Sequence, residues 1–135
     1  WRRERGSALL LTLLLTVLGA IICGLCVDAA SLLWVRSHAQ TTVNLAAQSI
    51  HLELGRNPAA TPAYLEETAR ATAAWNGIRH GTDGATVSLE PQEKGSRLTV
   101  RREAGVYFLR MFHPDPIPVY ARAELRAAPP SREGL

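Results

Sequence analysis

The chain lacks several features that would suggest a reactive or nucleic-acid-binding site. It has only two cysteines, Cys23 and Cys26, and both lie inside an apolar run, so the rest of the chain has no disulfide framework and no cysteine ligands for zinc. The formal net charge is only +3, and its basic residues are scattered, without interleaved aromatic residues. This pattern argues against nucleic acid as a partner.

Motifs for enzymatic chemistry are also missing. The four histidines form no HxxxH or HExxH motif, the glycines form no phosphate-binding loop with a lysine, and there is no GxSxG segment. His113-Pro114-Asp115 is more simply a stiff turn than a site. The sequence therefore predicts a protein that is not an enzyme, with no metal, no cofactor and no small-molecule substrate.

Charge is absent from one long segment, Ser7–Val27, which is rich in leucine. As a helix this segment would match a hydrocarbon core about 30 Å thick. Arg2, Arg3 and Arg5 precede it, and Asp28 is the first charge after it. By the positive-inside rule, residues 1–6 form a cytoplasmic basic segment, 7–27 a transmembrane helix, and residue 28 onward lies outside.

A cleaved signal peptide is the alternative interpretation of this segment. Val27-Asp28-Ala29 would allow a cut before Ala30, but the apolar run is longer than the usual 7–15 residues of a signal peptide. We therefore favour a retained anchor. In such a helix Cys23 and Cys26 act as small hydrophobic residues, and Ala20 and Gly24 form a small-xxx-small pair that lets another helix approach.

The helix is expected to continue beyond the membrane over residues 28–54, which contain no proline or glycine. Apolar residues recur there at spacings of three and four, which is one face of an amphipathic helix. The members of this stripe are Leu32, Val35, Ala39, Val43, Ala46, Ile50 and Leu54. The sequence predicts one rod from Ser7 to Leu54, on the order of 70 Å long, that Gly55 caps before Pro58.

Two partners are possible for the stripe. It either buries against the protein's own small domain, or part of it packs against other copies or partner subunits. Together with Ala20 and Gly24, these residues form the predicted helix-packing and assembly face.

A small extracytoplasmic α+β domain is expected over residues 59–127. A second helix starts at Pro62 with Thr61 as its N-cap, ends at Asn76-Gly77, and uses Trp75 as a core anchor. Alternation over 85–89, ended by Pro91, and over 97–101 predicts an antiparallel hairpin, and 119–125 a final strand.

The segment 106–112 is ambiguous between strand and helix because periodicity cannot decide over seven residues. We favour a short helix whose aromatic residues and methionine fill the core: Tyr107, Phe108, Met111 and Phe112. His113 to Pro116 is predicted to be a rigid turn, and 128–135 a disordered tail.

Several segments resemble TadE/TadG-like proteins of the Tad (Flp) pilus system. They are Arg5-Gly6-Ser7, the uncharged span, Val27-Asp28, "RSHAQTTVNLAAQSI" with Gln40, Asn44, Ala46 and Ala47, and "GVYFLRMF" before "IPVYARAEL". One departure is clear, because residues 7–11 are Ser, Ala, Leu, Leu and Leu and lack the glutamate of a pilin-type processing site.

The resemblance implies an α+β fold with a long N-terminal transmembrane helix that extends into a pilin-like domain. It implies a structural subunit, minor pilin-like, anchored in the bacterial cytoplasmic membrane. Its partners would be the lipid bilayer and other pilus or secretion subunits, including other TadE/TadG-like proteins. The alternative is a single-pass extracytoplasmic module that binds a ligand or senses one and assembles nothing.

Overall fold

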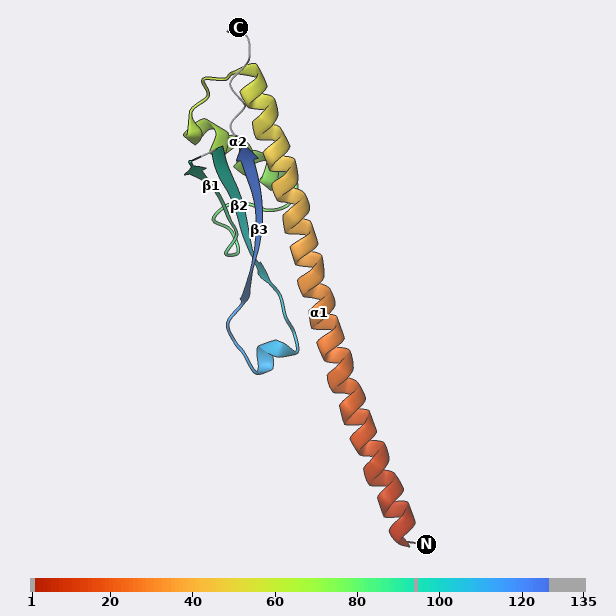
Figure 1. The fold of residues 1–135 in the computed structure, drawn as a ribbon. Coiled ribbons are helices and arrows are strands. Elements are labelled where there is room, and N and C mark those ends of the chain that lie inside the picture. The colour runs from red at the N-terminus through yellow and green to blue at the C-terminus, as the bar shows by residue number, and fades with distance from the viewer. Residues whose placement is uncertain (1, 94, 127–135) are drawn as a thin grey trace.

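A computed structural model describes residues 2–93 and 95–126, so the predicted tail at 128–135 lies outside the described residues. The elements follow in the order α1 (Arg2–Arg56), α2 (Pro62–Trp75), β1 (Thr86–Gln92), β2 (Gly95–Ala104), a 3₁₀ turn η1 (Leu109–Met111) and β3 (Ile117–Arg126). Figure 1 shows the sheet and α2 gathered along the C-terminal half of α1, while the N-terminal half projects alone. The predicted α+β class is confirmed.

Helix α1 is one uninterrupted rod of 55 residues, longer at both ends than the predicted Ser7–Leu54. The prediction that Gly55 caps it is wrong, because the helix runs through Gly55 to Arg56, and Gly55 is not among the glycines with a positive φ. The i→i−4 pattern persists to Asn57, whose N–H donates to the carbonyl of Glu53 at 2.8 Å. Pro58 disfavours helical geometry in the residue before it, which explains why the rod ends there.

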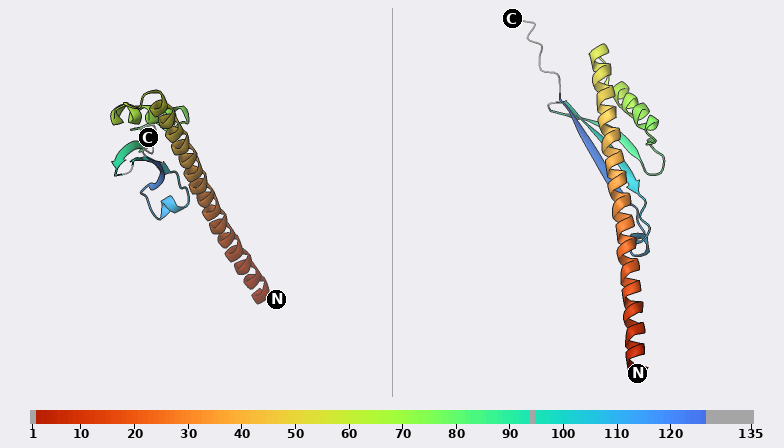
Figure 2. Two further views of the ribbon diagram at one scale, coloured as in Figure 1. Left: turned by 45° about the horizontal axis from the view of Figure 1, so that its top comes forward. Right: turned by 90° about the vertical axis from the view of Figure 1, so that its right-hand side faces the viewer.

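Both helices cover the same side of an antiparallel sheet with strand order β1-β2-β3. Helix α1 packs on β2 and β3, and α2 packs on β1 and α1. Figure 2, right, shows α2 running beside the C-terminal half of α1. The register pairs Val87 with Val100 and Val100 with Ala121, so apolar residues of the three strands form rows beneath the helices.

The core joins all these elements, and its buried apolar members are Ala39, Val43, Ala46, Ile50, Leu65, Ala69, Ala73, Ile78, Ala85, Val87, Leu98, Val100, Ala121 and Leu125. Alanines supply many of the contacts between the two helices. The distance between packed helix axes depends on the side chains at the contact, so these alanines favour a close approach of α2 to α1.

Helix α2 starts as predicted: Thr61 accepts a hydrogen bond from the N–H of Tyr64 at 3.3 Å, and Pro62 opens the helix. It ends at Trp75 with Asn76 as its C-cap, after which Gly77 has φ 84° and the N–H of Ile78 donates to the carbonyl of Ala73. Trp75, predicted to anchor the core, is 92% exposed, so that prediction is wrong. The buried face is Leu65, Ala69 and Ala73, and Trp75 lies two residues beyond it, about 200° around the helix.

The strands are longer than predicted. Pro91 does not end β1 but lies inside it, paired with Ser96, because a proline is tolerated on an edge strand whose N–H would face outward. Strand β2 extends over ten residues, not 97–101, and β3 begins at Ile117, before the predicted 119.

The segment 106–112 forms neither a core helix nor a strand. Only residues 109–111 form a 3₁₀ turn, and Tyr107, Met111 and Phe112 are 75–79% exposed, so the prediction that they fill the core is wrong. The inner side of the sheet is already covered by the two helices. The β2–β3 connection therefore extends past the end of the sheet along α1 (Figure 1).

Candidate assembly surface

Asp28, the first charge after the apolar run, holds the β2–β3 connection against α1. Its carboxylate is 1% exposed and accepts hydrogen bonds from three consecutive backbone N–H groups. The distances are 2.8 Å from Tyr107, 3.2 Å from Phe108 and 2.7 Å from Leu109. One turn further along α1, Ser31 Oγ donates to the carbonyl of Gly105 at 2.8 Å. The side chain that marks the end of the apolar run thus organises a loop about eighty residues away.

Two opposing effects act on the Asp28 carboxyl group. Burial raises the pKa of Asp28, but the hydrogen bonds from Leu109, Tyr107 and Phe108 favour the charged form and outweigh it. The pKa of Asp28 is therefore lower than its ordinary value of 3.8, and the group is ionised at neutral pH. A buried carboxylate is tolerated in this place because backbone donors replace its water.

The residues of the predicted helix-packing face lie in three different surroundings: the middle of the stripe, its two ends, and the part inside the apolar run. Its middle portion, Val35, Ala39, Val43, Ala46 and Ile50, is at most 4% exposed, because the protein's own sheet and α2 cover it. This observation supports the interpretation that the stripe packs against the protein's own small domain. Leu32 and Leu54, at the two ends of the stripe, are half-buried.

The two small residues of the face inside the apolar run lie in different surroundings. Ala20 is exposed, whereas Gly24 lies under the β2–β3 connection, and a Cβ placed on it would be 2.8 Å from Phe108 Cδ2. Gly24 therefore makes room for Phe108 of its own chain. Ala20 is therefore the one residue of the predicted face that is exposed and available to another helix.

A different line of apolar residues remains open on α1 outside the apolar run. Trp34, Leu45 and Leu52 are 61%, 40% and 68% exposed. They are separated by 11 and 7 residues, which are about three and two helical turns, so the three lie along one line of the rod. We name Trp34, Leu45 and Leu52 the lateral line. The sequence stripe missed it because its members are too far apart to stand out by periodicity.

Trp34 is held in place although it is exposed. Its ring stacks on His38 with 5.3 Å between ring centroids, and the Arg102 guanidinium lies 5.5 Å from its centroid. Arg102 Nη1 is 2.7 Å from His38 Nδ1, which makes that ring nitrogen the acceptor. A preordered aromatic side chain loses little entropy when a partner covers it, which suits a contact residue.

The outer edge of β1 is closed to strand pairing. The N–H of Val87 donates to His80 Nδ1 at 2.9 Å, its carbonyl accepts from Arg70 Nε at 3.2 Å, and the N–H of Leu89 donates to Glu66 at 3.3 Å. Pro91, at the next outward position, has no N–H. Since an open strand edge invites pairing with another chain, this arrangement directs contacts with partners away from β1.

Sites for small ligands are weakly developed among residues 2–93 and 95–126. An open cleft of about 360 Å³ lies beside the β2–β3 connection, lined in part by Asp83, Glu103, Arg110 and Asp115. No group of three His, Cys, Asp or Glu side chains in these described ranges is arranged to hold a metal ion. Cys23 and Cys26 are exposed free thiols on α1, on either side of Gly24.

Comparisons of the chain with protein-family models, with curated proteins and with solved structures find no match. The architecture alone therefore defines the class. A long apolar N-terminal helix whose second half packs against a small helix and a three-stranded antiparallel sheet is a pilin-like arrangement. Helix α1 is long and apolar enough to cross a membrane, a property shared by a membrane span and a signal sequence.

Proposed function

We propose that this protein is a membrane-anchored, minor pilin-like structural subunit of a Tad (Flp) pilus or a related secretion apparatus. It would act by assembly and not by catalysis. The observation that carries the proposal is the continuity of α1: the same helix supplies an exposed apolar rod at one end and the core of the domain at the other (Figure 1). Removing the apolar run would take away Gly24, which lies beneath Phe108 of the domain.

The contacts of Asp28 support retention of the run. A cut before Ala30 would remove the carboxylate that binds the N–H groups of residues 107–109, and also Gly24 beneath Phe108. We propose that residues 7–27 span the bacterial cytoplasmic membrane, with the basic N-terminus inside and the domain outside. Arginines at the N-terminal end favour this orientation.

Assembly in this proposal uses two surfaces of α1. Within the membrane, the exposed side chains around Ala20 meet neighbouring apolar helices. Outside it, the lateral line contacts partner subunits, because Val35, Ala39 and Ala46 are already occupied by the protein's own domain. The partners are other subunits of the pilus or secretion machinery.

Cysteine crosslinking tests this arrangement. In full-length protein in which Cys23 and Cys26 are replaced by alanine, cysteines are introduced singly at Leu45 and Leu52 and crosslinked in native membranes. Asn44→Cys is the matched control, since Asn44 is exposed on α1 one residue from Leu45, about 100° around the helix. We expect crosslinked adducts at Leu45 and Leu52 and few at Asn44.

Two outcomes would count against the proposal. Equal crosslinking at all three positions would indicate random collisions and not a defined face. A monomer at every position, together with saturable binding of a small ligand at the cleft near Arg110, would favour the ligand-binding module instead. In the source organism, deletion of the gene should abolish or alter surface fibres seen by electron microscopy.

A further inference from the structure

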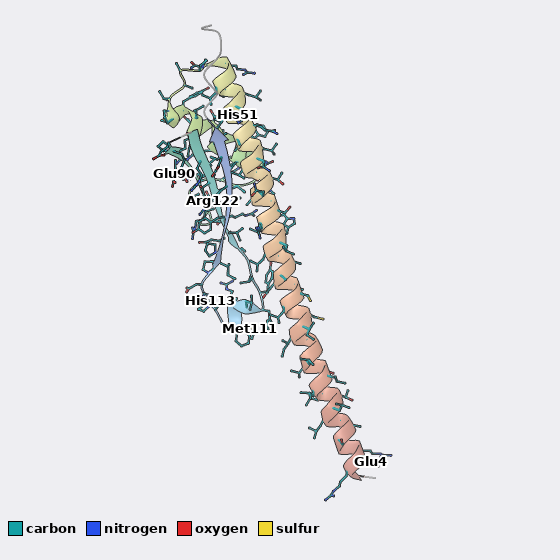
Figure 3. All side chains as sticks on the ribbon, in the orientation of Figure 1. Glu4, His51, Glu90, Met111, His113 and Arg122 are labelled. Carbon is teal, nitrogen blue, oxygen red and sulfur yellow. The ribbon has the colours of Figure 1, made fainter. Side chains whose placement is uncertain are left out.

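The β2–β3 connection, residues 105–116, carries an unusual set of exposed side chains. Tyr107, Met111 and Phe112 are 75%, 79% and 75% exposed, and Arg110 is exposed beside them. Figure 3 labels Met111 and His113 on this connection, beside the middle of α1 and at the end of the domain that faces the projecting rod. Soluble surfaces rarely gather large apolar side chains on one loop tip without a partner.

The level of this loop along α1 indicates what covers it. Phe108 packs over Gly24, which lies inside the uncharged run Ser7–Val27 and four residues before Asp28. At 1.5 Å per residue, this contact is about 6 Å on the membrane side of Asp28. Interfacial segments bury their apolar faces about 5–10 Å into the boundary between head groups and acyl chains, so the depth matches.

Most backbone N–H groups at the tip of this loop have hydrogen-bond partners within the protein. The N–H groups of Tyr107, Phe108 and Leu109 donate to Asp28, and those of Met111, Phe112 and His113 donate to carbonyls within the loop at 2.7–3.2 Å. Six of the seven N–H groups of residues 107–113 therefore have a partner within the protein, which lowers the cost of moving this tip into a region poor in water, where unsatisfied backbone groups are costly. This observation is independent of the apolar side chains.

We propose that the β2–β3 loop is a second membrane contact, in which Tyr107, Met111 and Phe112 insert into the interfacial layer of the same bilayer that α1 spans. The inference rests on the membrane-anchoring part of the proposed function. Tyrosine suits the head-group level because its ring is apolar and its hydroxyl is polar, and Arg110 offers a guanidinium to lipid phosphates. Two attachment points fix the tilt of the rod and the rotation of the domain relative to the membrane.

This geometry explains why Asp28 is covered. The carboxylate stands at the boundary of the span, where contact with lipid would be costly, and the loop screens it while it holds the loop. The consequence for assembly is that the lateral line is presented in a defined direction. A domain that could swing on a single helix would lose that orientation.

Site-directed spin labelling measures the depth of the loop. The full chain with Cys23→Ala and Cys26→Ala is reconstituted in nanodiscs of phosphatidylcholine and phosphatidylglycerol, and a nitroxide is attached at Met111→Cys. Collision with oxygen, which concentrates in lipid, is compared with collision with a water-soluble nickel chelate. The matched control is Trp75→Cys, which is also highly exposed but lies on α2 just after Thr72, whose hydroxyl bonds to Ser49, about 30 Å along α1 from Asp28.

We expect the oxygen-to-nickel accessibility ratio at 111 to be several-fold higher than at 75. A nitroxide at Leu14→Cys, within the apolar run, reports whether the run itself lies in the bilayer. High oxygen accessibility at 14 with equal ratios at 111 and 75 would overturn the loop insertion and leave the anchor intact, and the loop would then be a surface for another protein. Low oxygen accessibility at 14 would overturn both the anchor and the insertion that depends on it.

Discussion

Ile50 offers the sharpest test of the idea that α1 is part of the domain core and not merely a stalk. Its side chain is 0% exposed between the sheet and α2. Ile50→Ala removes three carbons, worth about 2.4 kcal/mol at about 0.8 kcal/mol per buried carbon, and the cavity left behind raises the cost to about 3 kcal/mol. Leu52→Ala is the matched control: two residues away and 68% exposed, it should cost about 0.5 kcal/mol or less.

Native-state hydrogen exchange of the central strand β2, measured by mass spectrometry on the full chain in a mild detergent, reads this difference directly. A loss of about 3 kcal/mol corresponds to roughly 100-fold faster exchange of the slowest β2 amides, since about 1.4 kcal/mol is tenfold. Leu52→Ala should leave exchange within about threefold of the parent. Equal exchange in both variants would refute the packing of α1 into the core.

Three further changes have defined outcomes. Asp28→Asn should accelerate hydrogen exchange of the amides of residues 107–109 and leave that of β2 little affected. Because the folded pKa of Asp28 lies below 3.8, the stability that its charge contributes is fully present above that pH and is lost as the pH falls through the folded pKa. Thermal unfolding followed down to about pH 2 should therefore show a steeper loss of stability in the parent than in the variant. Thr61→Ala should destabilise the domain by about 1 kcal/mol in denaturant unfolding by removing the N-cap of α2; no change would mean that the cap is not used. Trp75→Ala should change stability by less than about 0.5 kcal/mol, and a larger loss would restore Trp75 to the core.

Periodic patterns explain what was predictable from the sequence. The apolar stripe of α1 has a strict spacing of three and four residues, and it identifies the core face of the helix from Val35 to Ile50. The caps of α2 follow from local chemistry, because Thr61, Pro62 and Gly77 each act on their immediate neighbours.

Long-range contacts explain what was not predictable. Trp75 looked like a core residue by type, but its position on α2 relative to Ala69 and Ala73 turns it to solvent. The role of Asp28 depends on backbone groups about eighty residues away, and no local pattern encodes such a contact. Pro91 stays within β1 because β1 is an edge strand, a fact that only the order of the sheet reveals.

The central claim is that the apolar run is retained and anchors the domain as one continuous helix. Intact-mass analysis of the mature protein, recovered from carbonate-washed membranes of the source organism, tests this claim most directly. We predict a membrane-bound species whose mass includes residues 7–27 together with the domain. A soluble species that begins at Ala30 would contradict the account.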